Sequence, residues 1–411
     1  MTSPWWVRPG LDVDGGRLRI AGRDAETQAR ELGTPAFIYD LDRFGENVRS
    51  LGDAFVRAGL TVRQRFALKA NREPEVLEAL RALGGPGEPG SIGIDACSPG
   101  EVTHALAHGW RSDEISFTGT NVSERDLDVL LGAGVHLNLD AVSQVERVGR
   151  RAAELPAGKR IGLRVNPGAG AGYHEGLAYS GDRPTKFGIY PDRLDEALAV
   201  ARRHGLTVDT VHVHAGSGWL GDDIPAFERA IEATAAMTRH LIDAGCPIEE
   251  VNVGGGLGVP AREDERAIDL DAYAAAIARH LDPLGVAIGS EPGDYIAKDT
   301  AILLGEVVTV EERGGTTFVG LDIGWNVNNA YFIYRFAQEI VLCRAPAAPR
   351  TEVVTVTGHI NEGGDVFATD YLMPPVREGD IVALLNAGGY HQAMATTHCL
   401  RPTGSARFLR R

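Results

Sequence analysis

The segment QRFALKANR, residues 64–72, places Lys69 among apolar or small residues in a stretch that reads as a buried strand. A lysine that is removed from water loses affinity for its proton, and its amine becomes a nucleophile. Such an amine suits the formation of a Schiff base with an aldehyde. Lys69 is therefore a candidate for covalent chemistry.

Other polar residues with matching chemistry stand at the ends of predicted strands. Pyridoxal phosphate is an aldehyde cofactor, and the triple glycine at 254–256 offers backbone N–H groups that its phosphate can approach closely. The carboxylate of Glu291 can keep the pyridine nitrogen protonated, so that the ring withdraws electrons from the substrate α-carbon. His214 can lie flat against the ring. The remaining polar residues at strand ends are Asp95, Arg164, His212 and Ser217.

Each of these residues also has a structural explanation. A lysine at a strand end can form an ion pair or extend its amine to solvent. A triple glycine can mark a tight turn, and a histidine on an apolar strand can be a hydrogen-bonded core residue. All of these residues stand at the C-terminal ends of predicted strands, which is where (β/α)8 barrels carry their active sites. This shared placement favours the functional interpretation.

The elements that position these residues alternate between strands and helices from about residue 60 to 293. We predict eight strands: TVRQRFALKA, SIGIDAC, EISFTG, VHLNLDA, RIGLRVNP, VDTVHVHAG, EEVNVGGG and VAIGSEPG. A helical pattern follows every strand except the last, with apolar residues three and four apart in PEVLEALRAL and DRLDEALAVARRH. Ser123 and Ser143 are predicted helix caps. Eight such units indicate a closed parallel barrel.

The pattern changes after Asp299, where alternating strands with glycine-rich turns predict an antiparallel β domain. The expected fold is thus α/β, with an N-terminal (β/α)8 TIM barrel and a C-terminal antiparallel β domain. We place the barrel at residues 41–295 and the β domain at 296–411. Residues 1–40 also read as strand and are expected to join the β domain.

Composition narrows the classes of partner. The 411 residues contain 41 Lys and Arg against 56 Asp and Glu, and the resulting charge of −15 opposes binding to nucleic acid or to an anionic membrane. The four cysteines are widely spaced, which indicates neither a disulfide framework nor a zinc site. Without a signal-like start or a long apolar run, the chain is expected to be cytoplasmic and to bind small molecules.

The order and spacing of these motifs resemble the fold type III pyridoxal-phosphate decarboxylases, the group of diaminopimelate and ornithine decarboxylases. The matching motifs span residues 34–402 and include FALKAN, DACSPGE, LRVNP, TKFGI, HVHAGSG, NVGGGLG, EPG, GHINEGGD and NAGGY. The resemblance implies a barrel of the alanine-racemase type and a homodimer with two active sites at the subunit interface. It also implies pyridoxal 5'-phosphate as the cofactor and loss of the α-carboxylate of an amino acid as carbon dioxide.

Residue roles carry over from the resemblance by motif. Lys69 would hold the cofactor as a Schiff base with Asp95 nearby, His214 would stack on the ring, and Glu291 would pair with the pyridine nitrogen, supported by Arg164. The phosphate and the rest of the cofactor would contact Ser217, Gly254, Gly255, Gly256, Gly293 and Tyr390. Substrate contacts are expected from Asp294, Tyr334, Arg335, Asn361, Glu362 and Asp365, of which Asn361 and Glu362 are also catalytic candidates.

The chain departs from the family pattern at the protonation step. The family motif reads close to G-x-x-C-E-S-G-D, and its cysteine protonates the product α-carbon, whereas this chain has Asn361 at that position. An amide has no proton to give at neutral pH. The donor is therefore His359, His391, Lys69 or water.

Two further departures concern the substrate. Diaminopimelate decarboxylases carry E-P-G-R and a later R-P-x-x-Y, and their arginines are replaced here by Asp294 and Ala330. A buried carboxylate without a cationic partner is disfavoured, so we expect a substrate other than diaminopimelate, such as another amino acid or an amino-acid conjugate. Asp294 could instead pair with a barrel arginine such as Arg164.

Three functions remain open at this point. The leading hypothesis is a decarboxylase. A racemase or epimerase on the same scaffold is the second, because the acid cysteine is missing. The third is a cofactor-binding regulator without turnover, although small cofactor-binding homologues lack the whole β domain.

Overall fold

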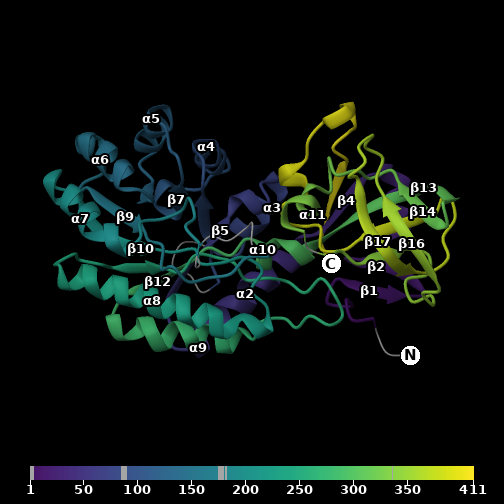
Figure 1. Ribbon diagram of the computed structural model, residues 1–411, viewed down its shortest axis with the longest axis horizontal. Helices are drawn as coiled ribbons and strands as arrows, with labels where there is room; N and C mark the ends of the chain where they lie inside the picture. Colours follow the sequence, from purple (N-terminus) through teal and green to yellow (C-terminus); the bar gives the residue numbers. More distant parts are fainter. Residues whose placement is uncertain (1–3, 85–89, 175–179, 181–182, 336) are drawn as a thin grey trace. The chain divides into compact units, whose positions relative to one another are not determined.

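The structure is a computed structural model that describes residues 4–84, 90–174, 180, 183–335 and 337–411 (Figure 1). The chain forms two compact units. The barrel unit comprises Asn47–Val259 and Arg266–Tyr295, and the β-rich unit comprises Met1–Glu46, Pro260–Glu265 and Ile296–Arg411. Residues 41–46 and 260–265 thus belong to the β-rich unit, although the sequence suggested one uninterrupted barrel segment.

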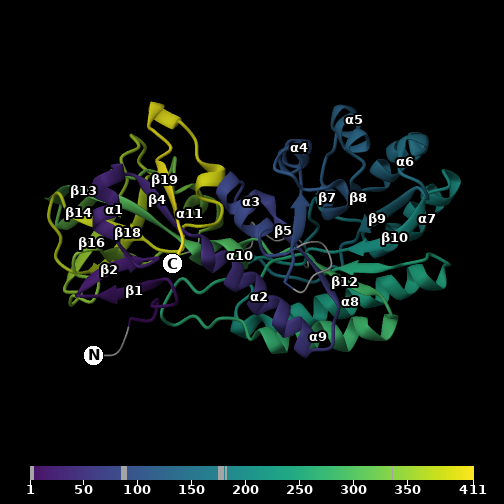
Figure 2. The same cartoon turned by 180° about the vertical axis from the view of Figure 1, so that it is seen from behind.

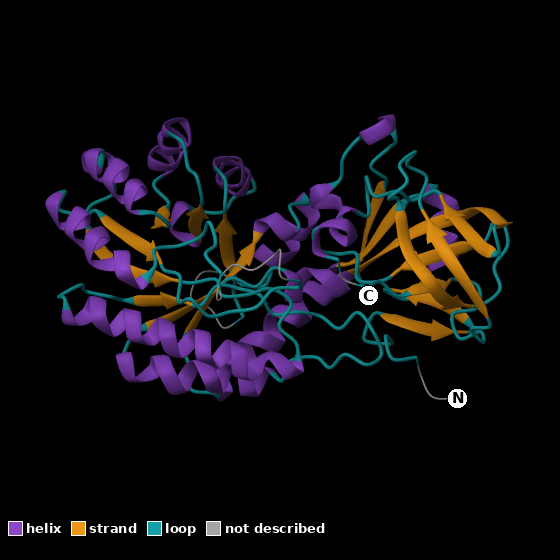
Figure 3. Cartoon of the chain, in the orientation of Figure 1, coloured by secondary structure: helices purple, strands orange, loops and turns teal. Residues whose placement is uncertain are grey.

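Eight parallel strands of the barrel unit close into a ring, which confirms the predicted barrel (Figure 3). In chain order they are β5 (Val62–Ala67), β6 (Gly93–Ala96), β7 (Ile115–Gly119), β8 (His136–Leu139), β9 (Arg160–Arg164), β10 (Thr207–His212), β11 (Glu250–Asn252) and β12 (Ala287–Ser290). β12 pairs with β5 and completes the ring. Because all strands run in one direction, the residues that follow them gather at one rim of the barrel.

A helix follows each of the first seven barrel strands. These helices are α3 (Pro74–Arg81), α4 (Pro99–Ala107), α5 (Glu124–Ala133), α6 (Val142–Arg150), α7 (Leu194–Arg203), α8 (Ile224–Asp243) and α9 (Leu270–Leu281). Helix α2 (Leu41–Arg57) precedes β5, and the short α10 (Asp294–Ala297) follows β12. Along α3 the apolar side chains of Val76, Leu77 and Leu80 are buried, as their spacing predicts. No helix among the described residues is long and apolar enough to cross a membrane.

One of the two predicted helix caps is present. Ser123 caps α5 and forms a capping box, in which its hydroxyl accepts from the Asp126 N–H and the Asp126 carboxylate accepts from the Ser123 N–H. The prediction for Ser143 is wrong, because α6 begins at Val142 and Ala141 takes the cap position without a side-chain hydrogen bond. Ser143 lies inside the first turn of α6, so it does not occupy the cap position.

The β-rich unit contains two sheets. The small sheet joins β1 (Leu11–Asp14), β2 (Arg17–Ile20) and β3 (Arg23–Asp24). The large sheet contains β4 (Ala36–Asp40), β13 (Ala301–Arg313), β14 (Thr316–Leu321), β15 (Ile340–Leu342), β16 (Glu352–Thr357), β17 (Val366–Met373), β18 (Ile381–Leu384) and β19 (Ser405–Leu409). Helices α1 (Ala25–Leu32) and α11 (Asn329–Tyr334) also belong to the β-rich unit.

The large sheet is mixed, so the expected purely antiparallel arrangement is wrong. β14 pairs with β16 in parallel, and β19 lies parallel beside β4 (Figure 2). The alternation of apolar and polar residues indicates that one face of each strand is buried, but it carries no information on strand direction. The N-terminal strand β4 pairs antiparallel with β13 and parallel with β19, so segments from three distant parts of the sequence share this sheet.

Apolar side chains between α1 and the two sheets form a core of the β-rich unit. This core includes Trp6, Leu11, Leu18, Ile20, Ala25, Ala29, Ile38, Ile302, Leu304, Val341, Cys343, Ile381, Ala383 and Leu385. Since about half of these residues lie before residue 40 and the others after residue 300, the unit requires both ends of the chain to be in place.

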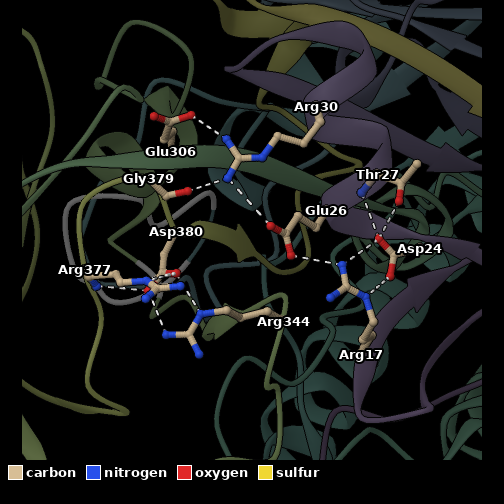
Figure 4. A network of polar contacts seen from close by, with 10 residues as sticks. All are labelled: Arg17, Asp24, Glu26, Thr27, Arg30, Glu306, Arg344, Arg377, Gly379 and Asp380. Atoms are coloured by element: carbon tan, nitrogen blue, oxygen red, sulfur yellow. Dashed lines mark hydrogen bonds and ion pairs between the residues drawn. The ribbon is translucent and has the colours of Figure 1, made fainter.

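A network of ion pairs links helix α1 to Arg17 of β2 and to Glu306 of β13 (Figure 4). Arg17 donates to Asp24 at 2.5 Å, and Arg30 donates to Glu306 at 2.8 Å. Asp380 is buried and accepts from the Nε and Nη2 atoms of Arg344 at 2.7 and 2.9 Å. Burial alone would raise the pKa of Asp380, but the bidentate bond from Arg344 lowers it. This pair therefore fixes the start of β18 beside the loop that follows β15.

We predict that Asp380→Ala destabilises the protein by about 1–3 kcal/mol, because the change removes a buried acceptor and leaves the Arg344 guanidinium without its partner. Urea unfolding followed by circular dichroism measures this loss. The control is Glu311→Ala, which removes the exposed pair with Arg313 and should cost less than about 1 kcal/mol. Equal stability of the two variants would contradict the structural role of Asp380.

Candidate active site

Lys69 lies directly after β5, in a short 3-10 turn over Leu68–Ala70. The sequence suggested a buried lysine, but the residue is only partly buried, whereas Leu68 and Ala70 on either side are almost fully enclosed. The difference arises because the strand ends at Ala67, so Lys69 no longer follows the alternation of the strand. A partly exposed amine at the barrel rim remains within reach of a ligand that enters from solvent.

The carboxylate of Glu291 is held by two side chains at the ends of neighbouring strands. It follows β12, and its Oε2 atom lies 2.8 Å from Nε2 of His212. Its Oε1 atom accepts a hydrogen bond from Nδ2 of Asn252 at 2.6 Å. Burial alone would raise the pKa of Glu291, but His212, Arg65 and the Asn252 amide together lower it to about 2. Glu291 is therefore ionised at neutral pH despite being buried.

Asp95, in β6, has the opposite environment. Burial raises its pKa well above the ordinary value, the charge of Glu291 adds to this effect, and the positive charge of Lys69 opposes it. Its Oδ1 atom is buried and has no hydrogen-bond partner among the described residues. When the surroundings raise the pKa of one carboxyl group and lower that of its neighbour, the first can stay protonated while the second stays ionised. Such pairs are typical of active sites in which the two groups have different roles.

His214 is a neutral imidazole. Its Nδ1 atom accepts a hydrogen bond from the backbone N–H of Gly255 at 3.3 Å. Burial lowers the pKa of His214 well below the ordinary value, and the positive charges of Lys69 and Arg164 add to this effect. A neutral ring with a fixed edge suits stacking, whereas it is a poor proton donor.

The triple glycine forms a tight turn in which side chains do not fit. Gly254 and Gly256 have φ angles of +69° and +101°, and a Cβ on Gly255 would lie 2.2 Å from the carbonyl oxygen of Glu291. The first two N–H groups already have protein acceptors, since Gly254 donates to Oδ1 of Asn252 at 2.9 Å and Gly255 donates to His214. The hydroxyl of Ser217 is buried without a partner among the described residues. A ligand phosphate would therefore use Ser217 and the rest of the turn.

Three other barrel residues named in the sequence analysis are all placed in the structure. The guanidinium carbon of Arg164 lies 4.6 Å from the centroid of the Phe187 ring, a cation–π contact. Gly293 is buried in the turn after β12. Asp294 is buried and accepts a hydrogen bond from the hydroxyl of Tyr173. Tyr173 was not among the sequence-based candidates, because it lies in none of the motifs on which the resemblance was based.

The other sequence-based candidates lie in the β-rich unit. Tyr334 ends α11 and stacks edge-on against Tyr390, with 5.2 Å between the ring centroids. Arg335 follows in a left-handed conformation. Asn361 and Glu362 are exposed on the loop before β17, and Glu362 lies 3.4 Å from Nε2 of His398. Their expected contacts with substrate stay predictions.

Asp365, on the same loop, is committed to the backbone. It is buried, and its two carboxylate oxygens accept from the N–H groups of Trp325 and Ile360 at 2.8 and 2.7 Å. These bonds hold the shape of the loop, so the geometry gives Asp365 a structural role, and its expected contact with substrate stays a prediction.

The two histidines considered as proton donors are both poor candidates. His391 is fully buried, its Nδ1 atom lies 2.9 Å from the Gly389 carbonyl oxygen, and its Nε2 atom lies 3.0 Å from Nε2 of Gln338. Burial lowers the pKa of His391 to about 4. Burial and the charge of Arg401 likewise lower the pKa of His359 to about 4. Both imidazoles are therefore neutral at pH 7, and a neutral imidazole is a much weaker acid than an imidazolium.

A comparison with protein families gives one match over more than half of the chain. Residues 42–298 match the family described as "Pyridoxal-dependent decarboxylase, pyridoxal binding domain". This range begins with helix α2 and includes every strand of the barrel.

Curated relatives match over nearly the full length. The chain is 36% identical to a diaminopimelate decarboxylase of Methanothermobacter thermautotrophicus, with 96% of this chain and 91% of the relative covered. It is 30% identical to the diaminopimelate decarboxylase of Streptomyces coelicolor, over 96% of this chain and 87% of the relative.

Solved structures agree with the fold. The diaminopimelate decarboxylase of M. jannaschii in co-complex with L-lysine is 25% identical, with a TM-score of 0.87 over 98% of this chain and 93% of that chain. That of Helicobacter pylori complexed with L-lysine is 26% identical, with a TM-score of 0.82 over 93% of both chains. Together with the family match, these relatives show that the chain belongs to the pyridoxal-dependent decarboxylases, enzymes that remove the carboxyl group of amino acids with pyridoxal phosphate as cofactor.

Proposed function

We propose that the chain decarboxylates diaminopimelate at the α-carbon. The observation that carries this proposal is the 36% identity, over 91% of its length, to a relative named diaminopimelate decarboxylase. The two solved relatives named above were crystallised with L-lysine, which is the product expected from that substrate. The different substrate inferred from Asp294 and Ala330 finds no support among these relatives, and neither does the racemase.

The described residues at the barrel rim fit pyridoxal phosphate. The turn at 254–256 is too tight for any side chain, and Ser217 leaves a buried hydroxyl unpaired beside it. Asp95 leaves a buried carboxyl oxygen without a partner. Orphaned polar atoms of this kind are explained by a polar ligand that satisfies them. When bound, the cofactor supplies an electron-withdrawing ring that accepts the electrons of the breaking carbon–carbon bond.

The protein residues have separate tasks in this proposal. Lys69 provides the amine that attaches the cofactor. The ionised carboxylate of Glu291 holds a proton at the pyridine nitrogen, which maintains the electron demand of the ring. His214 would lie against the cofactor ring as a neutral group and would add no positive charge there. For Tyr390, Asn361 and Glu362 of the β-rich unit, the contacts with phosphate or substrate that the family resemblance implies stay predictions.

The proton that replaces carbon dioxide requires a donor other than the cysteine of the family motif. His391 is enclosed by its two hydrogen-bonding partners, and His359 is neutral at pH 7. Among the side chains considered, the Lys69 Nζ atom is the remaining candidate, and it would donate the proton once it is no longer bound to the cofactor. We therefore propose Lys69, or a water beside it, as the donor to the α-carbon. The homodimer implied by the family resemblance is part of the same proposal.

The first prediction about function concerns Lys69. In the protein loaded with pyridoxal phosphate, Lys69→Ala should abolish the visible absorbance of the lysine-bound cofactor and reduce turnover by at least about 10³-fold, since both attachment and proton donation are lost. Lys159, on the loop before β9, offers a matched control, and Lys159→Ala should retain both properties. An unchanged spectrum in Lys69→Ala would refute the assignment.

The second prediction concerns the substrate. We expect the purified protein to release carbon dioxide from meso-diaminopimelate and to form lysine, with a kcat/KM at least about tenfold higher than for L-lysine or L-ornithine. Product mass and released carbon dioxide are the readouts. Turnover of L-ornithine or L-lysine in preference to diaminopimelate would overturn the substrate assignment and leave the decarboxylase assignment intact. Exchange of the α-hydrogen with solvent deuterium, without carbon dioxide, would instead indicate a racemase.

The third prediction concerns Asp95. Because burial raises its pKa in the folded state, its contribution to stability is present at low pH and is lost as the pH rises through the folded value. The cofactor-free Asp95→Asn variant should therefore be more stable than the wild type at pH 8, by on the order of 1–3 kcal/mol, with a smaller difference at pH 4. Cofactor binding should weaken in the same variant. Thermal unfolding at both pH values and a cofactor titration test these effects; a pH-independent difference would be inconsistent with the raised pKa.

A further inference from the structure

We propose that His212 and Asn252 are positioning residues for Glu291, which hold its carboxylate in one orientation and link it to the glycine turn. The inference rests on the proposed role of Glu291 toward the pyridine nitrogen. In this proposal, the side chains of Glu291, His212 and Asn252 together keep the pyridine nitrogen protonated, and the glutamate does not do so alone.

The strand register brings the three residues together. His212 ends β10 and Asn252 ends β11, and the two are directly paired in the register of these strands. Asn252 is also paired with Gly289 of β12, two residues before Glu291. His212 and Asn252 are 1% and 0% exposed, so the carboxylate meets these donors in an environment without competing water.

Each carboxylate oxygen accepts one bond. Oε2 lies 2.8 Å from Nε2 of His212, and Oε1 accepts from Nδ2 of Asn252 at 2.6 Å. Since an ionised carboxylate can only accept, Nε2 of His212 must carry the hydrogen. A carboxylate has about four acceptor sites, so lone pairs remain for a ligand N–H after both protein bonds are made.

The orientation of the Asn252 amide is fixed from both ends. Its Oδ1 atom accepts from the Gly254 N–H at 2.9 Å, while its Nδ2 atom donates to Glu291. The Gly254 carbonyl oxygen in turn accepts from the Glu291 N–H at 2.7 Å. These bonds close a ring through Asn252, Gly254 and Glu291, so the glutamate cannot turn without disturbing the glycine turn.

The state of His212 favours a functional over a purely structural role. Its Nδ1 atom is buried and has no hydrogen-bond partner among the described residues. Leaving a buried polar atom unpaired costs free energy, and an apolar residue of similar size would avoid that cost. The histidine is explained if its Nε2–H bond to Glu291 is what the site requires.

Nitrogen NMR of the full-length protein loaded with ¹⁵N-labelled pyridoxal phosphate tests the proposal. In the wild type we expect the chemical shift of a protonated pyridine nitrogen. In His212→Leu and Asn252→Ala the shift should move toward the unprotonated value, and kcat should fall by about 10–100-fold, in the range known for groups that orient a site residue. KM should change by less than about threefold. His212→Gln, which keeps an N–H donor of similar reach, should restore most of the wild-type shift.

Asn138 provides the matched control. It is a buried barrel asparagine on β8, 1% exposed, whose Nδ2 atom donates to Ser116 and Thr118 at 2.9 Å each. Asn138→Ala should lower the unfolding temperature while leaving the nitrogen shift unchanged. If it moves the shift as much as Asn252→Ala does, the effect is one of general stability and the proposal fails.

The outcomes separate the inference from the proposed function. A wild-type protein that binds no pyridoxal phosphate would overturn both. Wild-type shifts in both His212→Leu and Asn252→Ala, in protein that binds the cofactor, would overturn the positioning role alone. Should His212→Leu fail to fold, His212→Asn replaces it, since its shorter amide cannot span the distance to Glu291; an unchanged shift in that variant counts equally against the proposal.

Discussion

The barrel unit depends on keeping one buried carboxylate, that of Glu291, ionised. A negative charge without water is costly, and it persists only where donors and positive charges compensate it. Here the compensation comes from His212, Asn252 and the more distant charge of Arg65. Arg65 is itself bound to Glu250 at 2.6 Å, so the positive charge is held in place by a second ion pair inside the barrel. Closure of the ring is the condition for all of these contacts, since they join the ends of separate strands.

The same charge explains why the two carboxyl groups of the site differ. Glu291 receives direct hydrogen bonds, whereas Asp95 has one oxygen without a partner and lies in the field of Glu291. Two groups of the same chemical type thus differ in pKa because of their surroundings: the pKa of Asp95 is raised and that of Glu291 is lowered. In the cofactor-free protein, the charge of Glu291 disfavours ionisation of Asp95. A cationic ligand near Asp95 would reduce this unfavourable interaction. Stability and ligand binding are coupled at this position.

Sequence analysis predicted the eight strands, the barrel closure and the strand-end positions of Lys69, His214 and Glu291, because these follow from periodicity and from the geometry of parallel barrels. It did not predict the hydrogen bonds of His212 or Asn252, or the contact of Tyr173, since these depend on strand register and on how a long loop folds. The direction of β14 relative to β16 was also beyond reach, because alternation of apolar residues is the same in parallel and antiparallel pairs. Partial exposure of Lys69 depends on where β5 ends, and strand ends are poorly marked in a sequence.

The substrate expectation shows the limit of reasoning from single motif positions. Replacing an arginine by Asp294 suggests a site that rejects anions, if the carboxylate points unpaired toward the substrate. In the structure this carboxylate accepts a hydrogen bond from Tyr173, so part of its acceptor capacity is already used within the barrel unit. A hydroxyl donor spreads the negative charge and fixes the side chain, which weakens the argument that the position must repel a substrate carboxylate. Recognition of an anionic group depends on all the cations around a site and not on one position. The loss of one motif arginine therefore does not by itself establish that the site rejects diaminopimelate.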